Sequence, residues 1–86
     1  MHAVVANVKI NDHEGATSTL HSQVVPQTKG APGFVAGYWV EFERTRGTAV
    51  LVFETEEAAR GAAQAPPPGD FITFDSIEVG EVVANA

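Results

Sequence analysis

Apolar and polar positions alternate over the first ten residues of the chain. One side of the alternation carries Val4, Ala6, Val8 and Ile10, and several of these residues are β-branched. Alternation with a period of two, combined with β-branched residues, is typical of a strand. The pattern therefore predicts a strand over His2–Ile10.

A helical period replaces the alternation from His13 onward. Asp12 precedes this segment and is a good N-cap residue. Pro26 has no N–H to donate, so we expect the last turns to kink or stop there, and Gly30 suits the position just after the helix. The apolar stripe of this helix comprises Ala16, Leu20 and Val24.

The rest of the chain predicts three more strands and a second helix. The polar segment Glu43–Gly47 is typical of a hairpin turn, and the proline-rich segment Ala65–Asp70 ends the second helix. Thr55 is the expected N-cap of that helix. The strands are expected over Phe34–Phe42, Thr48–Glu54 and Phe71–Ala84, and the helix over Thr55–Gln64.

This order of elements, β-α-β-β-α-β, is that of the ferredoxin-like plan. We expect an α+β fold in a single domain over residues 1–86, with a four-stranded antiparallel sheet and two helices on one face. The first three strands are apolar on both faces, but two helices cover only one. Because an exposed apolar face is a typical interaction surface, the sequence predicts a homodimer that packs sheet against sheet.

Uninterrupted alternation along the second strand places the neighbouring residues Tyr38 and Trp39 on opposite faces. Phe34 and Tyr38 fall on one side, which we expect to lie under the helices. Trp39 and Glu41 fall on the other side, which we expect to face the second copy. We also expect Glu41 to pair with one of the two arginines of the hairpin turn.

Composition narrows the possible functional classes. The chain has 86 residues, 44% of them hydrophobic, a net charge of −6 and only five scattered Lys and Arg residues. Nucleic-acid binding needs clustered cations, so we expect no nucleic-acid partner. The absence of cysteine excludes a disulfide framework and a thiolate site. We expect a cytoplasmic protein with no membrane partner, because neither an export signal nor a membrane-length apolar run is present.

Asn7 and His21 are the candidate catalytic residues. The Asn7 amide both donates and accepts, so it can orient a substrate oxygen or stabilise an oxyanion; the simpler interpretation is a structural polar residue. His21 can act as a general base if it reaches the edge of a pocket, although such a residue is more often a partly exposed helix histidine. His13 and His21 are eight residues apart, which does not suit a helical metal pair, so we expect no metal.

Trp39 and Tyr38 are candidate substrate-binding residues. An indole ring can form the wall of a site for an aromatic ligand, with its N–H fixing a polar atom. The simpler interpretation is that Trp39 fills the dimer interface and that Tyr38 belongs to the core, with its hydroxyl at the rim. Our hypothesis is that Trp39 and Asn7 border one cavity between the two sheets, as its wall and its polar anchor.

Several stretches of the sequence resemble the dimeric α+β barrel superfamily, which includes antibiotic-biosynthesis-monooxygenase-like and stress-responsive barrel domains. They are Asn7, "VVPQTKGAPGFVAGYW" (Val24–Trp39), "VLVFETEEAARGAA" (Val50–Ala63) and "IEVGEVVA" (Ile77–Ala84). The resemblance covers nearly the whole chain and implies a ferredoxin-like fold that pairs through its sheets. It implies no single activity, because this superfamily hosts many.

Members of this superfamily include cofactor-free oxygenases of polycyclic phenolic substrates and haem-degrading oxygenases. Asn7 matches the first-strand Asn of the family. The haem-degrading pattern also expects a Trp at the end of the third strand, where this chain has Phe53, and an axial His on the second helix, where Thr55–Gln64 has none. The resemblance thus implies no haem or other cofactor, and Phe53 becomes a candidate substrate-binding residue.

Two functions of different classes remain open. The first is a cofactor-independent monooxygenase-like enzyme that acts on an apolar aromatic small molecule. The second is a non-catalytic dimeric module for ligand binding or an accessory role. A cavity with convergent polar groups favours the enzyme, whereas a space filled by side chains favours the module.

Overall fold

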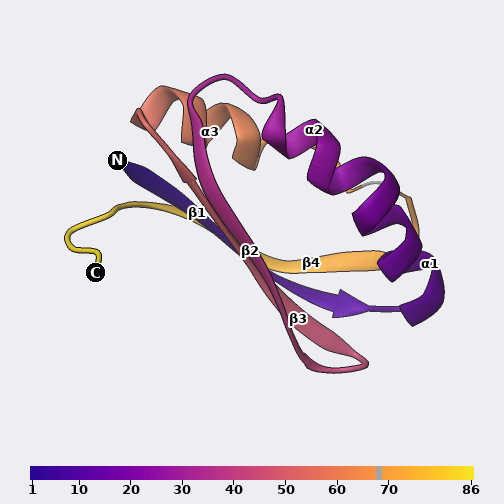
Figure 1. Ribbon diagram of the computed structural model, residues 1–86. Helices are drawn as coiled ribbons and strands as arrows, with labels where there is room; N and C mark the ends of the chain where they lie inside the picture. Colours follow the sequence, from indigo (N-terminus) through magenta and orange to yellow (C-terminus); the bar gives the residue numbers. More distant parts are fainter. Residues whose placement is uncertain (68) are drawn as a thin grey trace.

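The computed structural model describes residues 1–67 and 69–86 and shows one antiparallel sheet with helices on a single face (Figure 1). The strand order is β2-β3-β1-β4. This arrangement confirms the predicted ferredoxin-like α+β fold. The elements are β1 (His2–Ile10), α1 (His13–Thr19), the π-helical segment η1 (Leu20–Val24), α2 (Val25–Lys29), β2 (Phe34–Glu43), β3 (Arg46–Phe53), α3 (Glu56–Ala63) and β4 (Ile72–Glu81).

The element boundaries lie close to the predicted ones, with one clear exception. The last strand ends at Glu81, three residues before the predicted Ala84. The hairpin turn is shorter than expected, because strand pairing continues to Glu43 on one side and begins at Arg46 on the other. Within the predicted helix terminator, Pro68 lies outside the described residues.

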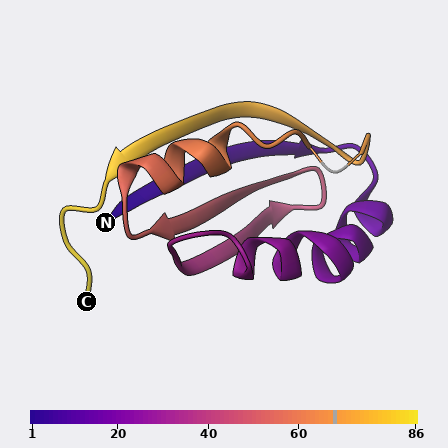
Figure 2. The same ribbon diagram turned by 90° about the horizontal axis from the view of Figure 1, so that it is seen from above.

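The first helical segment passes through Pro26, so of the two expected outcomes, a kink or a stop, the stop is wrong. The N–H of Val25 donates to the carbonyl of Leu20, five residues earlier, which closes a π turn just before the proline. A proline ring crowds the carbonyl four residues before it, and the wider π turn carries the chain past that constraint. α1, η1 and α2 therefore form one long helix that ends at Lys29 (Figure 2).

A bulge at the start of β2 decides which side chains face the helices. Phe34 pairs with Phe53 of β3, yet two residues later Ala36 pairs with Val52, so the register shifts by one residue. A bulge of this kind inserts an extra residue and resets the alternation of side chains. Beyond it, Trp39 lies on the same face as Phe34.

Because of the bulge, the side chains of β2 beyond Phe34 face the side of the sheet opposite to the predicted one. Trp39 faces the helices instead of the open side of the sheet, as its place in the pocket described below shows. Tyr38 faces away from the helices and is 65% exposed, so it does not belong to the core. The prediction failed because uninterrupted alternation was assumed from Phe34 onward.

The core lies between α3 and the sheet. Its fully enclosed members are Val4, Phe53 and Ala59, and Phe34 meets Phe53 edge to face with 5.8 Å between ring centroids. A Cβ at Gly37 would lie 3.0 Å from the Leu51 side chain and 3.2 Å from the Phe34 ring. Glycine at this position therefore leaves the room that lets Phe34 turn onto the core side.

In the described part of the chain, no helix covers the opposite face of the sheet (Figures 1 and 2). Val5, Val50 and Tyr38 follow one another across β1, β3 and β2 in the observed register. Val40, the next residue on this side of β2, is 44% exposed. We call this surface the open face. Among the described residues no helix is both long enough and apolar enough to cross a membrane.

Phe53→Ala is expected to lower the free energy of unfolding by about 3–5 kcal/mol, because it deletes a ring that is only 1% exposed and leaves a cavity. Urea denaturation followed by circular dichroism measures this loss. Val83→Ala is the control, since Val83 is 89% exposed and should change stability by less than about 0.5 kcal/mol. Equal stability of the two variants would contradict the assigned core.

Candidate functional site

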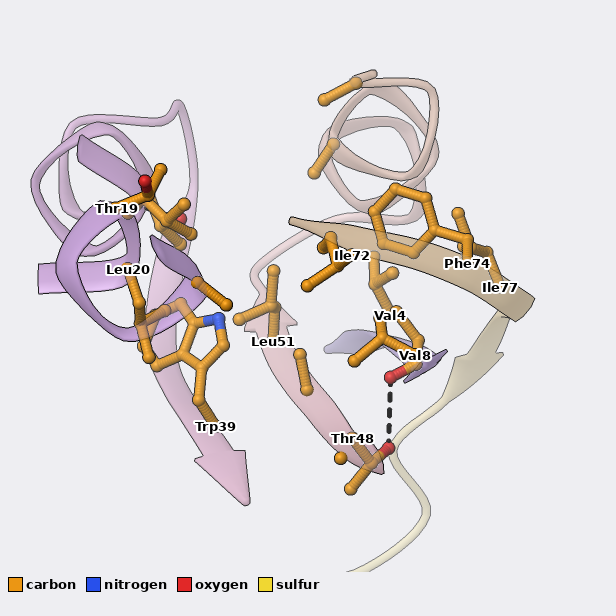
Figure 3. A pocket seen from close by; sticks show the side chains of 18 of the residues that line it. Val4, Val8, Thr19, Leu20, Trp39, Thr48, Leu51, Ile72, Phe74 and Ile77 are labelled. Carbon is orange, nitrogen blue, oxygen red and sulfur yellow. Dashed lines mark hydrogen bonds between the residues drawn. The ribbon is translucent and has the colours of Figure 1, made fainter. Parts of the chain in front are cut away.

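An apolar pocket lies between the long helix, α3 and the sheet (Figure 3). Its volume is about 370 Å³, and every strand and both helical layers contribute to its walls. A pocket of this size with few polar groups is typical of a small-molecule site. The larger apolar side chains that line it include Val4, Val8, Leu20, Leu51, Phe74 and Ile77.

The pocket exists because the two helical layers fill the space above the sheet unevenly. α3 packs closely on β1, β3 and β4, whereas the long helix makes few close backbone contacts with the strands. α3 presents only methyl groups to the pocket, from Ala62 and Ala63. Alanine side chains are too short to reach the far wall, so the gap between the helices stays open.

Trp39 forms one wall of this pocket. It rises from β2 beneath Leu20, and its indole nitrogen is directed toward the interior (Figure 3). In the described part of the chain, the indole N–H donates to no other residue. A flat apolar surface with one free donor suits the face of an aromatic ligand.

Glu41 lies two residues beyond Trp39 on the same strand and also lines the pocket. Its Oε1 atom is 2.5 Å from Nε2 of His13, the first residue of α1. The pair connects the start of the long helix to the edge strand β2. The expected pairing of Glu41 with a hairpin arginine is wrong, because Arg46 instead donates to Glu43 at 3.0 Å.

Four threonine residues line the pocket, and the hydroxyl groups of two of them are engaged by the backbone. Thr48 donates to the carbonyl of Ala6 at 3.1 Å, the dashed line in Figure 3. Thr28 donates to the carbonyl of Val24 at 2.7 Å. Thr17 and the buried Thr19 contribute the other two hydroxyl groups of the lining residues.

The structure brings together only part of the predicted site. Phe53 and Trp39 both line the pocket. Asn7 is outside it, in register with Thr48 and Ser76, and its amide donates to the Ser76 hydroxyl at 3.0 Å. The hypothesis that Asn7 and Trp39 border one cavity is therefore wrong, because they lie on opposite faces of the sheet.

Two other predicted residues also lie outside the pocket. His21 is exposed on η1 and is not part of the pocket wall, and Tyr38 is on the open face. Sequence reasoning missed the contact between His13 and Glu41. No local pattern signals this contact, because the two residues are 28 positions apart in the chain.

Across residues 1–67 and 69–86, no three His, Asp or Glu side chains gather closely enough to hold a metal ion. The pocket wall itself contains one ionisable side chain, that of Glu41. The arrangement suits binding of an apolar molecule with one or two polar atoms.

No protein-family model matches the chain, and no curated protein matches it by sequence. Among solved structures, the chain is similar to the haem degrader MhuD from Mycobacterium tuberculosis, determined with two haems bound in its active site. The TM-score is 0.52 and the identity 22%, and the match covers 96% of this chain and 98% of that one. The likeness confirms the predicted resemblance at the level of the fold.

Ala62→Leu is expected to weaken binding of the neutral dye N-phenyl-1-naphthylamine at least tenfold, because the longer side chain occupies the pocket. Dye fluorescence during titration measures the affinity. Gly61→Ala is the matched control on the same helix, since a Cβ at Gly61 meets nothing within 4 Å. Equal weakening in both variants would mean that the dye binds elsewhere.

Proposed function

We propose that this protein binds an apolar aromatic small molecule in the pocket and oxidises it as a cofactor-independent monooxygenase-like enzyme. The observation that carries the proposal is the apolar pocket of about 370 Å³ with Trp39 as a wall. In such a reaction a CH₂ group of the substrate and O₂ give a C=O group and water. The substrate supplies the electrons, so no cofactor is needed.

Haem does not fit this pocket, although haem is bound by the structurally similar protein. Haem iron is usually held by His, Cys, Met or Tyr, and none of these lines the described walls. No Lys or Arg lines them either, so the two propionate groups of haem would lack partners. α3 also carries no histidine along Glu56–Ala63. The proposed reaction therefore uses no haem.

The proposal includes a homodimer formed through the open face. Tyr38 and Val40 are 65% and 44% exposed there, beside the half-buried Val5 and Val50. Contiguous exposed apolar side chains favour contact with another protein surface. A second copy offers the same sheet face, and such self-complementary contacts are the commonest kind in homodimers.

A second candidate function is a non-catalytic dimeric module that binds the same class of ligand. The position of Asn7 and His21 favours it, because neither candidate catalytic residue lines the pocket. Asn7 has a structural partner in Ser76. In this alternative the pocket stores or presents its ligand without changing it.

Incubation with phenols and anthrones under oxygen separates the two functions. The enzyme should consume O₂ and form the quinone product, measured with an oxygen electrode and by absorbance. Heat-denatured protein and Ala62→Leu are the controls, because anthrones also oxidise spontaneously. Binding in calorimetry without any O₂ uptake above these controls would favour the module, and absence of binding would contradict both functions.

Tyr38→Asp is expected to weaken dimerisation by about 3–5 kcal/mol, the cost of leaving an unpaired charge in a buried interface. Analytical ultracentrifugation measures the change. Ser18→Asp on α1 is the control, since it adds the same charge at an exposed position on the helix side. A wild-type monomer at micromolar concentration would contradict the homodimer.

A further inference from the structure

One charged side chain stands in the apolar wall of the pocket. Among the described residues that line it, only Glu41 carries an ionisable group. No Lys or Arg among the described lining residues compensates its negative charge. A carboxylate beside apolar surface repels anions and attracts hydrogen-bond donors.

The carboxylate has one oxygen engaged and one available. Oε1 contacts Nε2 of His13, while within the described residues Oε2 has no hydrogen-bond partner. An ionised carboxylate accepts several hydrogen bonds through its two oxygens, so Oε2 can accept one from a ligand. Glu41 lines the pocket and its side chain is 48% exposed, so protein atoms do not enclose the carboxylate.

His13 fixes the direction of this carboxylate. It is the first residue of α1, and the Asp12 side chain anchors that helix start by accepting from the N–H of Gly15 at 3.2 Å. The Phe71 ring packs so closely on Gly15 that a Cβ there would lie 2.4 Å from it. The imidazole therefore projects from a well-held backbone and positions Glu41.

Trp39 and Glu41 are two residues apart on the same face of β2, which separates their Cα atoms by about 6.6–6.8 Å. That distance is close to the width of two fused aromatic rings. A flat ligand lying against the indole can thus reach the free carboxylate oxygen with a polar group at its edge.

We propose that Glu41, positioned by His13, makes the pocket selective for neutral aromatic molecules that carry an O–H or N–H donor, and disfavours anionic ones. This inference rests on the proposed function of the pocket and adds the chemical class of its ligand. A hydrogen bond to a charged group corresponds to a preference of about tenfold or more.

Three probes of nearly the same shape test the selectivity: 2-naphthol, 2-methoxynaphthalene and 2-naphthoate. Equilibrium dialysis at pH 7 gives the affinity of each. For the wild-type protein we expect 2-naphthol to bind about tenfold tighter than 2-methoxynaphthalene, and 2-naphthoate to bind weakest. The first pair differs in the donor, and the last probe adds the negative charge.

Glu41→Gln removes the charge and keeps the shape. We expect binding of 2-naphthoate to become about tenfold tighter, the preference for 2-naphthol to fall severalfold, and binding of 2-methoxynaphthalene to change less than twofold. Glu43→Gln is the matched control, since Glu43 lies on the same strand, pairs with Arg46 and is not part of the pocket wall. It should change none of the three affinities.

His13 is tested as a positioning residue. His13→Ala is expected to reduce the preference for 2-naphthol severalfold, because the carboxylate loses its fixed direction. His13→Gln retains a donor that can reach Glu41 and is expected to restore most of the preference. A loss of 2-methoxynaphthalene binding in His13→Ala would instead indicate that the pocket had collapsed, and would overturn the positioning role.

The outcomes distinguish the selectivity due to Glu41 from the binding of aromatic molecules in the pocket. If none of the three probes binds the wild-type protein, the pocket is not an aromatic site and both proposals fall. If all three bind with similar affinity, and Glu41→Gln changes nothing, the selectivity is overturned while the aromatic site stands.

Discussion

The bulge at the start of β2 is the constraint on which the site depends. By shifting the register between Phe34 and Ala36, it brings Phe34 and Trp39 to the same face of the sheet. Phe34 then joins the core, and Trp39 and Glu41 enter the pocket. A regular strand would direct the indole and the carboxylate to the opposite face, because a one-residue slip exchanges the two faces.

The long helix complements this arrangement from above. Its π-helical segment allows the chain to continue through Pro26 instead of ending a turn earlier. Leu20 of this helix lies over Trp39, while α3 contributes only the methyl groups of Ala62 and Ala63 to the pocket. Because α3 contributes only short side chains, a space between the two helices and the sheet stays open.

The two faces of the sheet are suited to different roles. The helix side encloses an apolar pocket with one carboxylate, and the open side presents Tyr38 and Val40 to the surroundings. Because these features lie on opposite faces of the same strand, a ligand on one side and a second copy on the other do not compete for space. Asn7 belongs to the open side, where Ser76 engages its amide.

The sequence by itself determined the order and type of the elements and the ferredoxin-like topology. These follow from local patterns: the alternation in His2–Ile10, the N-cap residues Asp12 and Thr55, and the polar hairpin after β2. The caps acted as expected, since Asp12 and Thr55 each accept from a backbone N–H three residues later. Such signals depend only on neighbouring residues.

The tertiary structure decided which side of the sheet each β2 residue faces, and hence which residues form the site. A bulge is set by how one strand pairs with the next, and here Gly37 leaves room for the Phe34 ring beside Leu51. The contact of His13 with Glu41 likewise joins residues 28 positions apart. Neither feature follows from the period of one segment, because both are fixed by packing between segments distant in the chain.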